Sequence, residues 1–291
     1  MRIVVLGGEG LLGKRLIKNF RKKSYFIQSI SRQNTADFIV KSYSFYEIDK
    51  AIKLSKASLI INTVALTNVD VCEINKTLAY EINAKICDIL SQLQLIHNFK
   101  IIHISTDQVY SGEGPHKEEN TNPINNYGNT KLLGENFLNK KNSLIIRTNF
   151  FGKSISKKPS YTDWLIESYM KNPNKKIKIS KSYFSPLNLE TLIDLIEKSF
   201  FKYKLYGIYN LGSFGKINKL EFSKKFLNIK FNNSENIQSS FSNFDNIIHV
   251  NTSAAIRPND MTLNCKKFIN ETYEELPNEE KLMKDLLLEY K

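Results

Sequence analysis

Cysteine is scarce in this chain, and the few thiols are widely separated. The 291 residues contain Cys72, Cys87 and Cys265, whose spacing does not match that of metal-ligand pairs. We therefore expect no metal site, reduced thiols and a cytoplasmic location. The histidines also have no ligand partners near them in the sequence. We expect structural or exposed roles for His97, His103 and His116.

Long apolar runs are missing as well. The longest, such as Leu59–Ile61 and Leu144–Ile146, are far too short to cross a membrane. The chain starts with a short β-branched run that ends at glycine, which predicts a first strand rather than a signal peptide. Because 41% of the residues are hydrophobic, we expect a globular protein of one or two domains with no membrane partner.

Acidic residues are outnumbered by basic ones, which gives a formal net charge of +13. A charge of this size raises the question of nucleic-acid binding. The lysines are spread along the whole chain rather than gathered in one segment, and a basic surface also suits a substrate that carries a diphosphate. We therefore expect no nucleic-acid partner, so that binding to duplex DNA is weak and collapses with added salt.

Strands and helices alternate through the first half of the chain. Buried strands are predicted at Arg2–Leu6, Tyr25–Ile30, Leu59–Asn62, Lys100–Ser105 and Ser143–Thr148. Helices are predicted at Leu11–Lys23, Tyr43–Leu54, Asn75–Leu95 and Asn126–Asn139. This alternation predicts an α/β fold with a doubly wound, Rossmann-type parallel sheet covered on both faces.

The alternation becomes less regular after Phe151. Loops are predicted at Gly152–Ser160 and Asn232–Asn246. Later elements are predicted as strands at Lys176–Ile179 and Gly207–Leu211 and as helices at Asn188–Phe201, Asn218–Leu227 and Asn278–Tyr290. We expect residues 1–150 to form an NAD(P)-binding domain and residues 151–291 to form mainly a smaller substrate-binding lobe. Segments near 176–212, including strands at Ile177 and Tyr209, are expected to return to the first sheet.

A glycine-rich turn follows the first predicted strand. Gly7, Gly10 and Gly13 are spaced as in a dinucleotide fingerprint, between a strand and a helix. Glycine permits close approach of a pyrophosphate, and the helix N-terminus offers free N–H groups to it. The alternative is a turn that only packs a helix on a strand. The expected cofactor-binding residues of this turn are Gly7, Gly10, Leu11, Leu12 and Gly13.

The end of the second predicted strand bears on the choice of cofactor. Arg32 stands there, and the first acidic residue after it is Asp37. An arginine can pair with a 2′-phosphate, whereas an acidic residue would hold the ribose 2′-hydroxyl of NAD. Arg32 therefore favours NADP(H), with NAD(H) as the alternative.

Tyr127 and Lys131 lie four residues apart in a predicted helix and so share one face. An ammonium beside a phenol favours the phenolate and lowers its pKa. Such a tyrosine can exchange a proton with a substrate oxygen, while a bound nicotinamide supplies the hydride. We therefore predict Tyr127 and Lys131 as catalytic and cofactor-binding residues.

Two further segments end predicted strands, where ligands sit in open parallel sheets. Val64 and Ala65 follow the third predicted strand and are expected to line the cofactor. Thr106 and Asp107 follow the fourth, and Thr106 can donate a hydrogen bond to a substrate oxygen. With Tyr127 downstream, they form a candidate catalytic group.

The order of these motifs resembles the extended short-chain dehydrogenase/reductases, and among them the dTDP-4-dehydrorhamnose reductases, which are RmlD-like sugar-nucleotide reductases. The matching segments are Gly7–Gly13, Asn62–Glu73, Ile104–Tyr110, Pro123–Glu135, Ile146–Asn149 and Arg257–Asn264. The likeness thus spans nearly the whole chain. It implies deoxysugar and polysaccharide biosynthesis, with a nucleotide-sugar substrate carrying a 4-keto group; a homodimer is left open.

The resemblance also implies roles for individual residues. Tyr127 would be the proton donor, and Lys131 would bind the nicotinamide ribose and tune Tyr127. Thr106 would hold the carbonyl oxygen of the sugar, and Asp107 would contact the sugar. Arg257 would contact the nucleotide diphosphate.

Departures from the family pattern leave alternatives open. Gln108 stands where the related dehydratases carry a glutamate, which argues against water elimination. Phe150 stands where the reductases usually carry tryptophan; it can stack on a ring but cannot donate a hydrogen bond. Gln108, Asn149 and Phe150 are expected near the substrate. Asn149 and Gly152 also resemble a branch that includes the regulatory β subunit of methionine adenosyltransferase, so a non-catalytic NADP-binding subunit and an epimerase are the alternatives.

Overall fold

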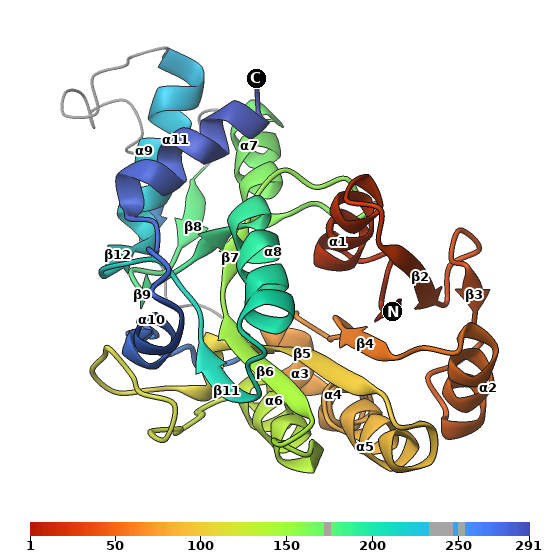
Figure 1. Ribbon diagram of the computed structural model, residues 1–291. Coiled ribbons are helices and arrows are strands. Elements are labelled where there is room, and N and C mark those ends of the chain that lie inside the picture. Colours follow the sequence, from red (N-terminus) through yellow and green to blue (C-terminus); the bar gives the residue numbers. More distant parts are fainter. Residues whose placement is uncertain (172–175, 233–246, 250–253) are drawn as a thin grey trace.

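A seven-stranded parallel sheet forms the centre of the computed structural model (Figure 1). The structure describes residues 1–171, 176–232, 247–249 and 254–291. The strands, in chain order, are β1 (Arg2–Leu6), β2 (Phe26–Ser31), β3 (Phe38–Ile39), β4 (Leu59–Asn62), β5 (Lys100–Thr106), β6 (Ser143–Thr148) and β11 (Gly207–Asn210). Their order across the sheet is β11-β6-β5-β4-β1-β2-β3, and every pairing is parallel. The predicted doubly wound α/β fold is confirmed.

Helices cover both faces of this sheet because alternate strand residues point to opposite sides. Ile3 and Val5 face a core shared with helices α1 (Leu11–Lys22) and α8 (Leu189–Glu197). Val4 and Leu6 face a second core shared with α2 (Phe45–Ser55) and α5 (Lys85–His97). Three further helices, α3 (Val69–Ile74), α4 (Lys76–Asn83) and α6 (Asn126–Phe137), pack against one another near α5.

The C-terminal lobe has a separate apolar core. Its helices are α7 (Tyr161–Lys171), α9 (Lys219–Asn232) and α11 (Glu279–Glu289). Its short strands are β8 (Ile177–Ile179) with β13 (Ile247–His249), and β9 (Tyr183–Phe184) with β12 (Ile217–Asn218). Two more strands, β7 (Phe150–Phe151) and β10 (Leu187–Asn188), pair with each other, and α10 (Lys266–Thr272) packs on β11.

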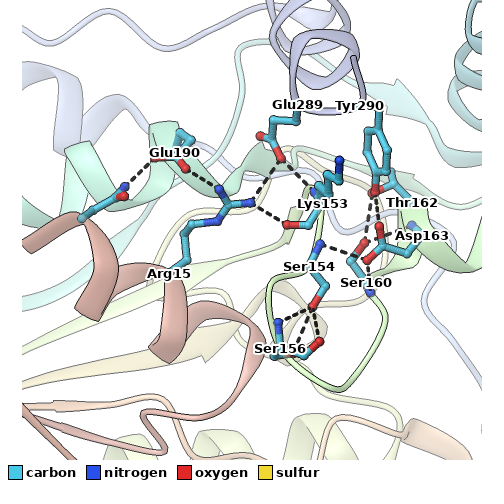
Figure 2. Close-up of polar contacts among 11 residues, drawn as sticks. Arg15, Lys153, Ser154, Ser156, Ser160, Thr162, Asp163, Glu190, Glu289 and Tyr290 are labelled. Atoms are coloured by element: carbon cyan, nitrogen blue, oxygen red, sulfur yellow. Dashed lines mark hydrogen bonds and ion pairs between the residues drawn. The ribbon is translucent and has the colours of Figure 1, made fainter.

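Arg15 on α1 joins the sheet domain to the lobe (Figure 2). Its guanidinium donates to Glu190 on α8 at 2.8 Å and to the carbonyl oxygen of Lys153 at 2.6 Å. The Lys153 N–H in turn donates to Glu289 on α11 at 2.8 Å. At the far end of the 152–160 loop, Lys158 donates to Thr67, which follows β4, at 3.0 Å. These contacts hold the loop between the two parts of the protein.

Two predictions of secondary structure are wrong. The expected helix Asn75–Leu95 is interrupted at Ala84, whose φ of −109° and ψ of −55° separate α4 from α5. Continuous helical periodicity does not reveal a break of one residue. The strand at Ile177 does not return to the large sheet but pairs with β13, whereas β11, which contains Tyr209, does return. The loop predicted at Asn232–Asn246 lies outside the described residues except for Asn232, which is the last residue of α9.

Several elements were not predicted; α3 and α10 are too short to show a clear period, whereas α7 is as long as the predicted helix α2. Among the residues that the structure describes, none of the helices combines the length and the apolar composition needed to span a bilayer.

Candidate functional site

The glycine turn between β1 and α1 has the shape of a phosphate cradle. Gly7 has φ of 86°, and a Cβ on Gly13 would lie 2.4 Å from the Gly7 carbonyl oxygen. Helix α1 is capped by Gly10, so its first turn lacks a side-chain cap and keeps N–H groups available. Leu12 is buried in the core and can offer only its backbone to a ligand, and Leu11 is partly buried beside it. These residues fit a pyrophosphate at the helix N-terminus.

The segment after β4 packs against this turn. A Cβ on Gly7 would lie 2.9 Å from both Thr63 Oγ1 and Val64 Cγ2, so the close approach requires glycine. Val64 is buried, and its N–H donates to Asn62 Oδ1 at 3.1 Å. The structure thus brings Val64 and Ala65 to the same edge of the sheet as the glycine turn, as predicted for parallel strands.

Arg32 is exposed directly after β2, with its guanidinium 5.5 Å from the centre of the Tyr43 ring. Asp37 accepts hydrogen bonds from the Ser29 N–H at 2.8 Å and the Ser29 hydroxyl at 2.9 Å. It also pairs with Arg21 at 3.2 Å. Asp37 is therefore engaged with β2 and α1, and Arg32 carries the charge at the strand end.

Thr106 lies beside Tyr127, and its hydroxyl acts to lower the pKa of the Tyr127 phenol. Thr106 ends β5, and Tyr127 lies in the first turn of α6, which Asn125 caps by accepting from the Gly128 N–H at 2.9 Å. A Cβ on Gly128 would lie 2.2 Å from the Gln108 carbonyl oxygen. The residue after Tyr127 must therefore be small, because α6 packs closely against the turn that follows Thr106.

The pKa of Tyr127 is raised in the structure, whereas the sequence predicts that Lys131 lowers it. Burial is the largest cause of a raised pKa of the Tyr127 phenol, with the nearby Asp107 carboxylate adding to it and the Thr106 hydroxyl opposing it. Lys131 is fully buried, and its Nζ lies 2.7 Å from the Ile104 carbonyl oxygen and 3.2 Å from His103 Nε2. Burial lowers the pKa of Lys131. Tyr127 is therefore a neutral phenol, the form that can donate a proton.

Asp107 is fully buried beside Tyr127 and has an unusual pKa. Burial raises the pKa of its carboxyl to about 6, against the opposing effects of hydrogen bonds from Asn149 and Thr106 and the charge of Lys219. Asn149 Nδ2 donates to Asp107 Oδ2 at 2.8 Å. The carboxyl therefore changes charge near neutral pH in the folded protein.

This carboxyl should make stability depend on pH. Because its pKa is raised on folding, its stabilising contribution is complete below about pH 4 and is lost as pH rises through about 6. We expect Asp107→Asn to gain stability relative to the wild type across this window, by at most about 2–3 kcal/mol. Urea unfolding of both proteins at about pH 5 and about pH 8 measures this difference. A difference that is the same at both values would contradict the raised pKa.

A cavity of about 1310 Å³ opens between the sheet domain and the C-terminal lobe. Its lining includes five basic residues, Lys178, Lys181, Lys216, Lys219 and Arg257, and three acidic residues, Asp70, Glu113 and Asp260. Tyr161 and Trp164 line it too, with ring centres 5.8 Å apart and planes inclined by 28°. Basic and aromatic groups together suit a ligand that carries phosphates and a base.

Lys219 connects this cavity to the catalytic group, since its charge acts on Asp107. Its Nζ lies 4.4 Å from the centre of the Tyr161 ring. Arg257 pairs with Asp70 on α3, with Nη2 2.9 Å from Oδ2. The cavity and the end of β5 are therefore adjoining parts of one candidate site.

The remaining predicted substrate residues separate into two groups. Gln108 accepts a hydrogen bond from Asn125 Nδ2 at 3.0 Å, and Asn149 contacts Asp107, so both lie beside the Thr106 strand end. Phe150 lies in β7 and packs against the core under α1 and α8. Sequence reasoning missed Lys219, Tyr161 and Trp164, which belong to no motif; a basic residue at the start of the predicted Asn218–Leu227 helix was the available signal.

Comparisons with known proteins agree with this geometry. The family model of the RmlD substrate binding domain matches residues 1–291. A dTDP-4-dehydrorhamnose reductase of Aggregatibacter actinomycetemcomitans is 32% identical over 158 residues, which is 52% of either chain. The methionine adenosyltransferase 2 subunit beta of Danio rerio is 30% identical over 138 residues, 46% of this chain and 42% of that one. The chain thus spans about half the length of the curated relatives that it matches.

A solved structure covers more of the chain. The crystal structure of dTDP-4-dehydrorhamnose reductase from Bacillus anthracis, in complex with NADP, aligns with a TM-score of 0.82 and 25% identity. The alignment covers 99% of each chain.

Proposed function

The chain belongs to the RmlD substrate binding domain family of extended short-chain dehydrogenase/reductases, and from that premise we propose that it reduces a keto-sugar nucleotide with NADP(H). The observation that carries the proposal is the placement of Thr106 beside Tyr127, next to a basic cavity. The cofactor assignment draws on the glycine turn and on the Bacillus anthracis reductase, which was crystallised with NADP. NAD(H) is the alternative cofactor.

The catalytic residues have separate roles at one carbonyl group of the substrate. The nicotinamide, when bound, supplies a hydride to the carbonyl carbon. Tyr127, a neutral phenol, donates its proton to the carbonyl oxygen. The Thr106 hydroxyl donates a hydrogen bond to the same oxygen and stabilises the negative charge that develops there. Lys131 holds the nicotinamide ribose, at the same edge of the sheet as the glycine turn.

The cavity is assigned to the nucleotide part of the substrate. Lys219 and Arg257 present positive charge to a diphosphate, and the neighbouring aromatic rings offer a surface for a base. The sugar then lies toward Asp107, Gln108 and Asn149. A 4-keto-6-deoxy sugar nucleotide is the substrate class that this arrangement and the relatives favour.

Two alternatives make different predictions. A regulatory subunit would bind the cofactor without turning over a sugar, although it would not need Thr106, Tyr127 and Lys131 together. An epimerase would use these residues but regenerate its tightly held cofactor. The test is a panel of keto-sugar nucleotides with NADPH, followed by absorbance. Net loss of NADPH supports the reductase, while binding of NADPH without net loss for the whole panel refutes it.

Arg32 should set the preference between cofactors. We expect NADPH to bind about tenfold more tightly than NADH, because one charged contact to the 2′-phosphate contributes about 1.4 kcal/mol. Fluorescence titration measures both affinities. Arg32→Ala should remove the preference, whereas Arg2→Ala, which removes an arginine at the opposite end of the sheet, should keep it. Equal affinities in the wild type would contradict the assignment.

A further inference from the structure

Three side chains surround the ring of His103 in the middle of the sheet. His103 lies on β5 and is fully buried. Its Nδ1 is 3.1 Å from Asn62 Nδ2 at the end of β4, and its Nε2 is 3.2 Å from Lys131 Nζ on α6. Cys87 on α5 lies 3.7 Å and 3.8 Å from the two ring nitrogens. The ring thus bridges the last residue of a strand and the lysine assigned to the cofactor.

Asn62 determines which nitrogen of His103 carries the proton. The Val64 N–H donates to Asn62 Oδ1 at 3.1 Å, which fixes the orientation of the amide. Asn62 therefore presents its NH₂ group to His103 Nδ1, which must accept. Burial places the pKa of His103 well below its usual value, so the ring is neutral and has one N–H group. That N–H is on Nε2 and points at Lys131.

An ammonium group has three donors and no acceptor, so it cannot accept from His103 Nε2–H. An uncharged amine can accept this hydrogen bond and still donate to the Ile104 carbonyl oxygen at 2.7 Å. We propose that Asn62 and His103 are positioning residues that hold Lys131 as an uncharged amine until the cofactor binds.

Among the other groups that face Lys131, Cys87 and Glu135 favour its ammonium form, and burial opposes them. Glu135, one turn further along α6, is bound by the guanidinium of Arg147, whose Nη2 lies 2.6 Å from Glu135 Oε2. Cys87 is an uncharged thiol, because burial raises its pKa to about 12. Tyr127, one turn earlier, is a neutral phenol. Burial itself lowers the pKa of Lys131.

Cofactor binding changes the number of hydrogen bonds that Lys131 must donate. This step rests on the proposed function, in which Lys131 holds the nicotinamide ribose. An amine has two N–H donors, and the Ile104 carbonyl uses one of them. To reach both ribose hydroxyls as well, Nζ needs three donors, so it must take up a proton and give up the hydrogen bond from His103 Nε2–H. The phosphates of the cofactor favour the same change. Binding of NADPH should therefore be coupled to proton uptake.

The tautomer can be measured in the protein alone. In protein labelled with ¹⁵N-histidine, the ring shifts of His103 should report a neutral ring protonated on Nε2. Asn62→Asp keeps the shape of the side chain but presents an acceptor to Nδ1, so the proton should move to Nδ1 or the ring should become charged. The ring that responds to this variant is thereby identified as His103. A His103 ring protonated on Nδ1 in the wild type would overturn the proposal.

Proton uptake gives a second readout. Calorimetric titration with NADPH at mildly alkaline pH, in buffers of different ionisation enthalpy, counts the protons taken up. The wild type should take up about one proton more than Lys131→Met. This variant is the reference because any protons bound by the 2′-phosphate of NADPH are counted in both proteins. Asn62→Asp should match Lys131→Met, because its Lys131 is already charged. Equal uptake in all three proteins would overturn the proposal.

These outcomes separate the inference from the proposed function. A protein that shows the Nε2 tautomer and the extra proton, yet reduces no sugar nucleotide, would refute the reductase and retain the inference. A protein that reduces a sugar nucleotide but has His103 protonated on Nδ1 would refute the inference and retain the reductase.

Discussion

Tyr127→Phe is expected to lower turnover of the sugar nucleotide by about 10²–10⁴-fold, the usual contribution of general acid catalysis. The substitution removes the phenolic proton and keeps the ring, which is almost entirely buried. Because Tyr127 acts on the substrate oxygen, the affinity for NADPH should stay close to that of the wild type. Steady-state kinetics and fluorescence titration measure the two quantities.

A matched control is Tyr25→Phe. This residue lies on the other side of the protein, where its hydroxyl donates to Glu197 at 3.2 Å, so its loss should leave turnover unchanged. Wild-type turnover in Tyr127→Phe would refute the assigned acid. An equal loss of turnover in both variants would mean that the effect comes from stability rather than from the missing proton.

Arg147→Met is expected to cost about 3–5 kcal/mol of folding free energy, because it leaves a buried carboxylate without its partner. Arg147 and Glu135 are both fully buried and share three hydrogen bonds of 2.6–3.1 Å. Arg147 also donates to the Tyr110 hydroxyl at 2.7 Å, and Ser105 donates to Glu135. This network supports the end of β5 just before Thr106. Chemical denaturation measures the loss.

Two comparisons make this result specific. Arg147→Met combined with Glu135→Gln should recover part of the loss, because the unpaired charge is gone. Lys281→Met breaks an exposed pair with Asp285 and should cost less than about 1 kcal/mol. If Arg147→Met costs no more than Lys281→Met, the buried pair does not support the strand end.

The sequence predicts most of what depends on short segments. Gly7 and Gly10 lie between a strand and a helix, and Gly13 lies in the first turn of that helix, as expected, since turn geometry and helix start are local properties. Tyr127 and Lys131 do share the buried face of α6. The period of that helix fixes this arrangement whatever surrounds it.

Other features depend on contacts between distant segments and were not predicted. Lys131 turns to His103 and Ile104 because β5 passes beneath α6, a contact that the helical spacing of Tyr127 and Lys131 does not reveal. The pairing of β8 with β13 joins residues about seventy positions apart. Lys219 acts on Asp107 from another lobe. Patterns within one helix or strand carry no information on such neighbours.

The central claim is hydride transfer to a sugar carbonyl, and isotope transfer tests it most directly. The protein would be supplied with NADPH deuterated at the transferring position and with a dTDP-linked 4-keto-6-deoxy sugar, and the product examined by mass spectrometry and NMR. The account predicts consumption of NADPH and one deuterium on the former carbonyl carbon. A product that lacks deuterium would contradict it. A failure to consume NADPH with this or any other keto-sugar nucleotide would also contradict it.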